Sequence, residues 1–378
     1  MKILFVTPSY KPAYCYGGPT ISVSELAEAL VSLGHTVTVY TTTANGQVEL
    51  DVSTGKANFI NGVEVYYFRR ITKDHTHTSP TLWLRLWKTI KHFDVVHLQS
   101  WWNLLVIGAA AICKLKETKY ILSPRGMLGA YSFTNKHNFS KKILHHLVGK
   151  RLLKQSFLHA TTPLEWNDCM QVNKDWRGFM AYNLINLPTD KSSSRIRNNV
   201  FTFGFLSRID PKKGLELLFS SLACLTFNYK LRIAGSGEAN YINSLKSLAG
   251  KLSISDKIEW CGWKDGVEKY QFIETLDLFV LTSYNENFAI VVAESLAIGT
   301  PVLVSDKVGL ADYVQEKKLG YVCELNTSSI RHKLEFIYKR ESELKTISET
   351  APQIINVDFD KKNLAKQYIQ AYQHIETS

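Results

Sequence analysis

The sequence predicts an α/β protein with two domains. The chain has 378 residues, which is more than one hydrophobic core usually holds. Residues 2–42 read as a strand, a glycine-containing loop, a helix and a second strand, which is the order of a βαβ unit. Another strand, loop and helix begin at Val200, after a polar and basic segment at 189–199 that is typical of a linker. We therefore expect one domain over 1–186 and a second over 187–359.

The composition is that of a soluble globular protein. Apolar residues make up 45% and charged residues 21% of the chain. Residues 2–7 are too short for a secretory signal, and no apolar run reaches the roughly 20 residues that a membrane-spanning helix needs. The six cysteines form no C-x-x-C pair, which favours reduced thiols over a zinc site or disulfides. We expect a cytoplasmic protein that does not cross a bilayer.

The net charge of +11 is unevenly distributed along the chain. No Asp or Glu occurs between Lys119 and Leu164, whereas eight Lys and Arg residues do. Residues 139–153 read as a helix with two compatible interpretations. It is a surface helix docked by its apolar face, and its basic face can rest on anionic lipid at about 1 kcal/mol per basic residue. The basic residues of 119–154 are thus our candidates for contact with an anionic membrane surface.

The first domain begins with the βαβ unit. After the strand at 2–7, the loop contains Tyr16-Gly17-Gly18-Pro19, and we expect Thr20 to be the N-cap of the following helix. The strand at 35–42 completes the unit. A glycine pair before a helix lets the backbone approach phosphate or sugar closely, although most such pairs mark only a turn.

The rest of the first domain follows from short local patterns. Asn61-Gly62 is a hairpin turn signal. His97 lies near the end of a buried strand, where it is either a core histidine or a site residue. We expect this hairpin at 57–68, a helix around 82–90, and strands at 94–98, from Ile121, at 157–161 and at 178–182.

The second domain opens with a cationic loop. The strand at 200–206 leads to Arg208 and Lys213, then to Gly214 and a helix from Leu215. Two spaced cations before a helix N-terminus form a natural diphosphate site, because the guanidinium grips two oxygens and the ammonium adds a point charge. The alternative is an exposed basic loop without a ligand.

The next strand of the second domain, at 231–234, ends in a second glycine turn. Residues 235–240 read G-x-G-x-x-N, so they lack the third glycine of the dinucleotide fingerprint. A partial match of this kind weighs against binding of a nicotinamide dinucleotide.

The stretch from Ser283 to Val304 reads SYNENFAIVVAESLAIGTPVLV and places two carboxylates eight positions apart. A buried strand at 278–281 precedes it, and a helix at 289–297 is ended by glycine and proline. Glu286 thus lies in the loop after a strand, and Glu294 about two helical turns further on. This pair suits a ligand with hydroxyls at one end and anionic oxygens at the other, such as a nucleotide sugar. Either Glu alone could instead complement a helix dipole or be solvated.

The E-x7-E stretch and the R-x4-K-G element at Arg208 resemble the signatures of the retaining GT-B glycosyltransferases of family 4 (group 1), whose second element is G-R-x4-K-G, with Ser207 here in place of the first glycine. The resemblance covers nearly the whole chain and is strongest from Phe203 to Gly309. It implies the GT-B fold, which has two Rossmann-like domains with the donor in the cleft between them. It also implies that a C-terminal helix, here at 360–378, crosses back to the N-terminal domain.

The resemblance further assigns roles to individual residues. Glu286 would contact the hydroxyls of the transferred sugar, and Glu294 would hold the ribose. The backbone of Asn287, Phe288, Ala289 and Ile290 would face sugar and phosphates, although the family usually has glycine where this chain has Ala289. The remaining donor-side residues are the glycines of both turns and a segment that borders the base: Gly17, Gly18, Gly235, Gly237, Trp263 and Lys264. Trp263 could equally serve only in packing.

On the acceptor side the chain departs from the family. The family often has a second His two residues after His97, and here Gln99 stands there. Many relatives also place a His in the loop after the next strand, where this chain has Arg125. We therefore take His97, Gln99 and Arg125 as acceptor-side candidates, with Arg125 suited to an anionic group.

Together these observations predict a metal-independent, retaining glycosyltransferase without a cofactor. No D-x-D lies at a strand end, and Asp358-Phe359-Asp360 is better read as a helix cap. Glu286, Arg208 and Lys213 would act in catalysis, the two cations meeting the charge of the departing diphosphate. The expected partners are a nucleotide-diphosphate sugar and a saccharide or lipid-linked saccharide of envelope polysaccharide or lipopolysaccharide synthesis, with the protein peripheral on the inner face of the cytoplasmic membrane. We expect no nucleic acid.

Two other classes of function fit the sequence less well. The cationic block is compatible with a non-catalytic protein that binds membranes or nucleic acid, but such a protein has no use for Glu286 and Glu294. A GT-B phosphorylase would need a lysine that carries pyridoxal phosphate, and no motif for one is found.

Overall fold

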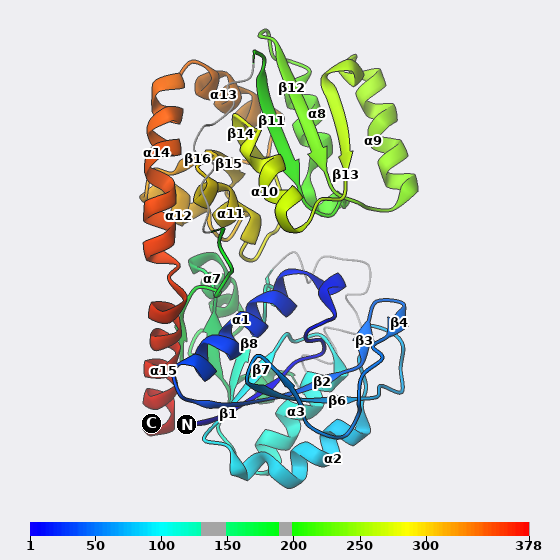
Figure 1. Cartoon of the computed structure of the whole chain (residues 1–378), viewed down its shortest axis with the longest axis vertical. Coiled ribbons are helices and arrows are strands. Elements are labelled where there is room, and N and C mark those ends of the chain that lie inside the picture. The colour runs from blue at the N-terminus through cyan, green and yellow to red at the C-terminus, as the bar shows by residue number, and fades with distance from the viewer. Residues whose placement is uncertain (130–148, 189–198, 378) are drawn as a thin grey trace. The chain divides into compact units, whose positions relative to one another are not determined.

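The computed structural model describes residues 1–129, 149–188 and 199–377. The chain divides into two compact units: unit 1 is Met1–Asn186 with Phe359–Ser378, and unit 2 is Leu187–Asp358. Each unit contains a largely parallel sheet with helices packed on it, so the predicted α/β class is confirmed (Figure 1). The predicted linker at 189–199, except its last residue, and most of the predicted helix at 139–153 lie outside the described residues, as does much of the basic block at 119–154.

Unit 1 is built on an eight-stranded sheet in the order β10-β9-β8-β7-β1-β2-β6-β5. All neighbours are parallel except β5 and β6, which form the antiparallel hairpin predicted from Asn61-Gly62. Both turn residues have positive φ (49° and 82°), as such a hairpin turn requires. The strands are β1 (Lys2–Val6), β2 (Thr36–Thr42), β5 (Asn58–Ile60), β6 (Val63–Phe68), β7 (Val95–Gln99), β8 (Ile121–Ser123), β9 (Phe157–Ala160) and β10 (Gly178–Met180), with β3 (Ala44–Asn45) and β4 (Val48–Glu49) as a separate pair.

The strand order of unit 1 reverses between β1 and β7. From β1 the chain builds outward through β2 to β6, and from β7 it builds in the other direction through β8, β9 and β10. In open α/β sheets, ligands bind outside the carboxyl ends of the strands at such a reversal. The segment after β1 leads to Gly17 and to Gly18, which begins the next helix, and Gln99 is the last residue of β7. These predicted residues therefore follow or end the two strands at the reversal.

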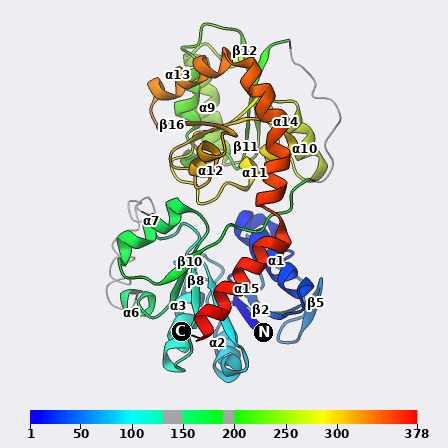
Figure 2. The same cartoon turned by 90° about the vertical axis from the view of Figure 1, so that its left-hand side faces the viewer.

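The helices of unit 1 pack on its sheet in two groups. Helix α1 (Gly18–Ser32) contacts the C-terminal helix α15 (Lys361–Thr377), as Figure 2 shows, and α2 (Pro80–Thr89) contacts α3 (Leu104–Leu115). The predicted return of the C-terminal helix to the first unit is therefore observed. The other helical segments of unit 1 are η1 (Tyr14–Tyr16), η2 (Ile90–His92), α6 (Lys150–Leu153) and α7 (Pro163–Val172).

The predicted start of α1 is wrong by three residues, because Thr20 was expected as the N-cap and Gly17 is the N-cap. The helix begins at Gly18, with Gly17 as its N-cap at φ 68° and Pro19 in the first turn. Proline suits this first turn because its fixed φ is helical and its missing N–H has no partner there. Thr20 is instead buried, and its hydroxyl lies 3.0 Å from that of Ser9.

Unit 2 contains a six-stranded parallel sheet in the order β13-β12-β11-β14-β15-β16. Its order reverses between β11 and β14, which brings the loops after these two strands together. The strands are β11 (Phe201–Leu206), β12 (Tyr229–Ala234), β13 (Ile258–Gly262), β14 (Leu278–Leu281), β15 (Val302–Ser305) and β16 (Gly320–Cys323).

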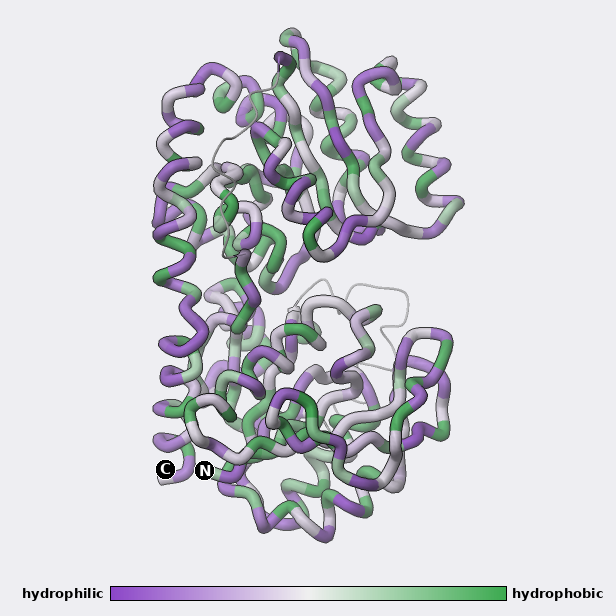
Figure 3. Tube along the Cα trace, viewed as in Figure 1, coloured by the Kyte–Doolittle hydropathy of each residue, from purple (hydrophilic) through white to green (hydrophobic). Residues whose placement is uncertain are grey.

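The helices of unit 2 include the predicted elements after β11 and β14. They are η4 (Pro211–Lys213), α8 (Leu215–Leu222), α9 (Ala239–Lys251), η5 (Ser255–Lys257), α10 (Gly266–Glu274), α11 (Ile290–Ile298), α12 (Ala311–Glu316), α13 (Thr327–Tyr338) and α14 (Glu341–Asp358). Figure 3 shows hydrophilic and hydrophobic residues alternating along α14 and α15, the pattern of helices with one buried face. Between them, Asp360 accepts a hydrogen bond from the backbone N–H of Asn363 at 2.8 Å, which supports its predicted role as a cap.

Candidate functional site

The first part of the candidate site is formed by two loops of unit 2, after β11 and after β14. Gly214 has φ 68°, and a Cβ there would overlap the carbonyl oxygen of Thr282. The Thr282 hydroxyl donates to the Gly214 carbonyl at 3.1 Å, and the Tyr284 N–H donates to the Lys212 carbonyl at 2.8 Å. Because only glycine permits this approach, the R-x4-K-G element needs its glycine to bring the two loops into contact.

These contacts place Lys213 and Glu286 in an ion pair. The Lys213 side chain is 11% exposed and that of Glu286 is 23% exposed, so both are shielded but still reachable. The backbone of Glu286 is fixed from the other side, because its N–H donates to the Lys307 carbonyl at 3.0 Å and its carbonyl accepts from Gly309 N–H at 2.7 Å. The sequence predicted both side chains as site residues, but it did not predict that they pair.

Two further cations belong to the same loop. Arg208 is exposed, and no carboxylate of the described residues pairs with it. Lys212 is half-buried; burial lowers its pKa, and the charge of Glu286 opposes this shift. The loop therefore offers three positive charges beside the N-terminus of α8, which favours an anionic ligand.

The loop after β14 enters α11 through an unusual residue. Ala289 is the N-cap of α11 and has φ 67° and ψ 69°, in the left-handed region that favours glycine. Phe288 and Ala289 are buried, whereas Asn287 and Ile290 are half-buried. This chain has Ala289 where the resembled family usually has glycine. The left-handed backbone conformation of Ala289 is one for which glycine is suited.

Glu294 lies in the second turn of α11 and is paired with Lys269 of α10. The Lys269 Nζ lies 2.5 Å from Glu294 Oε1, and the Glu294 side chain is 8% exposed. Burial raises the pKa of Glu294, and the neighbouring ammonium opposes this shift. Sequence reasoning predicted Glu294 but missed Lys269, because no motif marks that position.

The glycine turn after β12 packs against the cationic loop. Gly235 and Gly237 have no room for a side chain, because a Cβ would overlap the carbonyl oxygens of Ser207 and Ile209 respectively. The N–H of Gly235 also donates to the carbonyl of Gly262 at the end of β13, at 2.8 Å. These glycines thus hold three strand-end loops together. Their contact with a nucleotide remains an expectation from the resemblance.

The segment after β13 exposes its two predicted base-side residues. The Trp263 side chain is 55% exposed, so the alternative that it serves only in packing is not supported. Its indole N–H donates to Asp265 at 3.3 Å, and Lys264 pairs with Glu268 at 3.1 Å. An exposed indole at the end of a strand is available to stack on a base.

In unit 1, Arg125 and Gln99 form a hydrogen-bonded pair at the carboxyl ends of β8 and β7. Arg125 Nε and Nη2 donate to Gln99 Oε1 at 3.0 and 2.8 Å, and Nη1 donates to Asn183 Oδ1. Burial lowers the pKa of Arg125. Among the described residues no carboxylate pairs with this guanidinium, and the nearby Glu165 instead accepts from Gly126 N–H at 2.6 Å. Arg125 is therefore a buried cation held by neutral amide oxygens.

His97 has both ring nitrogens in hydrogen bonds within a buried network. His97 Nδ1 lies 2.8 Å from the Tyr372 hydroxyl of α15, and its Nε2 lies 2.6 Å from the Ser123 hydroxyl. Ser123 also lies 2.6 Å from His159 Nδ1, and His159 Nε2 lies 3.0 Å from the Ala181 carbonyl and 2.9 Å from the Tyr368 hydroxyl. This network supports the interpretation of His97 as a core histidine, which fastens α15 to the sheet, over its acceptor-side role.

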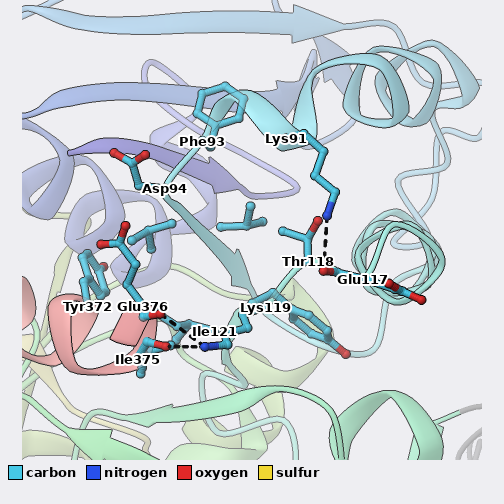
Figure 4. A pocket seen from close by; sticks show the side chains of 13 residues that line it. Lys91, Phe93, Asp94, Glu117, Thr118, Lys119, Ile121, Tyr372, Ile375 and Glu376 are labelled. Carbon is cyan, nitrogen blue, oxygen red and sulfur yellow. Dashed lines mark hydrogen bonds between the residues drawn. The ribbon is translucent and has the colours of Figure 1, made fainter. Parts of the chain in front are cut away.

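A pocket of about 240 Å³ in unit 1 lies away from these residues (Figure 4). Its lining includes Asp94 and Tyr120, which precede β7 and β8, so it lies at the amino ends of the strands. In Figure 4, Lys119 points to the end of α15, where it donates to the carbonyls of Ile375 and Glu376 at 3.3 and 3.2 Å. This pocket is therefore separate from the reversal points where the predicted residues lie.

The described residues contain neither a cluster of metal ligands nor a helix suited to crossing a membrane. Within 1–129, 149–188 and 199–377, no three His, Cys, Asp or Glu side chains are grouped so that they could hold a metal ion. No helix in these ranges has the length and apolar character needed to cross a bilayer.

Comparisons with known proteins agree with the geometry. Residues 187–354 match the family model "Glycosyl transferases group 1", and residues 16–161 match "Glycosyltransferase Family 4". An uncharacterised glycosyltransferase of Methanocaldococcus jannaschii is 27% identical over 397 residues, which is 98% of each chain. A lipopolysaccharide core biosynthesis glycosyltransferase of Rhizobium meliloti is 25% identical over 166 residues, 44% of this chain and 47% of that protein. The crystal structure of Anabaena HepE in complex with UDP-glucose has a TM-score of 0.75 and 19% identity, covering 99% of this chain and 100% of that one.

Proposed function

The chain belongs to the group 1 and family 4 glycosyltransferases and has their GT-B fold, and on this basis we propose that it transfers a sugar, with retention, from a nucleotide diphosphate to a saccharide acceptor. The observation that carries the proposal is the Lys213–Glu286 pair at the strand reversal of unit 2. It joins a cation for phosphate to a carboxylate for sugar hydroxyls in one place, which is the chemistry that a nucleotide sugar requires.

In this proposal the cations of unit 2 bind the diphosphate. Arg208 and Lys213 lie beside the N-terminus of α8, where backbone N–H groups and the helix dipole favour negative charge. They stabilise the charge that develops on the diphosphate as its bond to the sugar breaks. We propose that this arrangement does the work that a metal ion does in other transferases.

The reaction is a substitution at the anomeric carbon. The bond from that carbon to the phosphate oxygen breaks, and a bond to the acceptor oxygen forms on the same face. The acceptor's proton passes to the departing phosphate, so the products are the glycoside and the nucleoside diphosphate. Glu286 accepts hydrogen bonds from hydroxyls of the sugar and orients it, and Glu294 accepts them from the ribose.

For the acceptor we propose a saccharide, and more narrowly a lipid-linked saccharide of envelope polysaccharide or lipopolysaccharide synthesis. The lipopolysaccharide enzyme of Rhizobium meliloti among the relatives supports this choice. The buried cation Arg125, which donates to the amide oxygens of Gln99 and Asn183, supports an anionic group on the acceptor. The basic residues of 119–154 would bring the protein to an anionic membrane surface.

A screen of nucleotide sugars tests the proposal. Purified protein is mixed with UDP-, ADP- and GDP-sugars, and a rise in melting temperature identifies the donor. Hydrolysis and transfer are then followed by NMR, which reports the anomeric configuration of the first product, with and without EDTA. An inverted product, or activity abolished by EDTA, would overturn the retaining or the metal-independent part of the proposal. If the protein binds anionic vesicles but no nucleotide sugar, the proposal that the unit 2 site binds a nucleotide-sugar donor is overturned.

A further inference from the structure

Glu294 is the only charged residue of α11, whose sequence is IVVAESLAI. Its side chain is 8% exposed, and its neighbours along the helix are buried. A carboxylate in such surroundings tends to take up a proton, because burial disfavours the charged form. A protonated carboxyl group loses much of its capacity to accept hydrogen bonds.

Lys269 supplies the charge that opposes this tendency. It lies on the neighbouring helix α10, and its Nζ is 2.5 Å from Glu294 Oε1. The ammonium also lies 4.6 Å from the centre of the Tyr270 ring, so that it is held from two sides. Its side chain is 21% exposed, which makes it a largely buried lysine with one specific partner.

The pair leaves one oxygen of Glu294 available. Among the described residues none donates a hydrogen bond to Oε2. Oε2 is also not fully enclosed, because it does not belong to the buried side-chain atoms that lack a hydrogen-bond partner. The carboxylate is therefore fixed through Oε1 and open at Oε2. This is the arrangement expected of an acceptor for a ligand hydroxyl.

We propose that Lys269 is a positioning residue for nucleotide binding, which keeps Glu294 ionised and fixes its orientation so that Oε2 accepts from the ribose hydroxyls. The inference rests on the proposed function, since it presupposes that Glu294 meets the ribose. Lys269 does not touch the reacting atoms and acts through Glu294.

The test is calorimetric titration with UDP, ADP and GDP, using for all variants whichever nucleotide binds the wild-type protein most tightly. At pH 7 we expect Lys269→Met to weaken binding by about 10- to 100-fold, since a hydrogen bond to a charged acceptor is lost. As the pH is raised to 9, Glu294 of this variant ionises again, and we expect most of the affinity to return. Wild-type affinity should change little over the same range.

Matched variants separate positioning from simple loss of structure. Lys269→Arg keeps the charge and should bind within about threefold of wild type. Glu294→Gln should bind weakly at both pH values, because no group is left to ionise. Lys317→Met removes the lysine of another pair of unit 2, with Asp358 at 2.7 Å, and should leave affinity unchanged.

Each outcome decides the inference. Wild-type affinity for Lys269→Met, or an equal loss at pH 7 and pH 9, overturns it, and circular dichroism shows whether the variant is folded. If Lys269→Met does not fold, the same pH comparison is made with Lys269→Gln. If none of the three nucleotides binds the wild-type protein, the proposed function has failed, which is a different result from the failure of Lys269 alone.

Discussion

Lys213 and Glu286, 73 positions apart in the sequence, form an ion pair at the strand reversal of unit 2. The pair exists because Gly214 lets the loop after β11 touch the loop after β14. A donor diphosphate would compete with Glu286 for Lys213. When the phosphate pairs with the Lys213 ammonium, the Glu286 carboxylate becomes available to accept hydrogen bonds from the sugar hydroxyls. We therefore expect the two ends of the donor to bind in a coupled way.

Removing the ammonium tests this coupling. We expect Lys213→Met to lower kcat by about 100-fold, because a charge that stabilises the departing diphosphate is lost. KM for the donor should rise as well, since the same group also binds the ground state. Steady-state kinetics with the donor found by screening measure both effects. Lys317→Met, which breaks a pair without a predicted role, should have the kinetics of wild type. A Lys213→Met enzyme within threefold of the wild-type kcat would contradict this role.

The conformation of Ala289 predicts a stabilising substitution. At φ 67° a Cβ is unfavourable by about 1–2 kcal/mol relative to glycine, so Ala289→Gly should raise the free energy of unfolding by about 1 kcal/mol. Ala293→Gly, four residues on in the helix interior, should lower it by about 1 kcal/mol or more. Urea denaturation followed by circular dichroism measures both. Equal destabilisation by the two changes would show that the left-handed conformation of Ala289 does not matter for stability.

The sequence predicted those parts of the site that are encoded by local patterns. Gly214, Glu286 and Glu294 lie in strand–loop–helix segments whose order alone places them at the carboxyl ends of strands. The pairing of Lys213 with Glu286 could not be predicted, because it depends on which strands are neighbours. Lys269 was missed for the same reason, since it reaches Glu294 only through the packing of α10 on α11.

Two sequence interpretations were changed by the surroundings of the side chain. Thr20 has the chemistry of an N-cap, but Pro19 and the conformation of Gly17 start the helix earlier. His97 lies at a strand end, as a site residue would, but its ring is enclosed and bound to Ser123 and Tyr372. For Thr20 the neighbours in space decide the role, and for His97 they favour the core interpretation, one of the two that the sequence left open.

The crowded glycine turn predicts unequal effects for two glycine substitutions. A Cβ on residue 237 would overlap the backbone carbonyl of Ile209, so Gly237→Ala should lower the free energy of unfolding by about 1–3 kcal/mol. In Gly250→Ala the new Cβ meets only the Ser255 hydroxyl at 3.9 Å, and the helix α9 should gain about 1 kcal/mol. Thermal unfolding of the two variants measures the difference. Similar melting temperatures would show that the turn can move away from the loop after β11.

The buried histidines predict a loss of stability in mild acid. Burial lowers the pKa of His97 well below its usual value, with further lowering by His159 and Arg125. Burial, together with the charge of Arg125, lowers the pKa of His159 to about 3. In the unfolded chain both titrate near pH 6.5. Below that pH the unfolded chain therefore binds protons that the folded chain does not, and stability falls as the pH decreases.

Each of these histidines should contribute a slope of about 1.4 kcal/mol per pH unit below pH 6. Denaturant unfolding at pH 7.5, 6.0 and 5.0 measures the total. His159→Gln removes one titrating group, so its stability should depend less steeply on pH than that of wild type. His332→Gln, which changes an exposed histidine of unit 2, is the control and should keep the wild-type slope. If the stability of His159→Gln and that of wild type have the same slope against pH, the folded protein binds the proton at His159. The interpretation that neutral imidazole rings join α15 to the sheet would then be wrong.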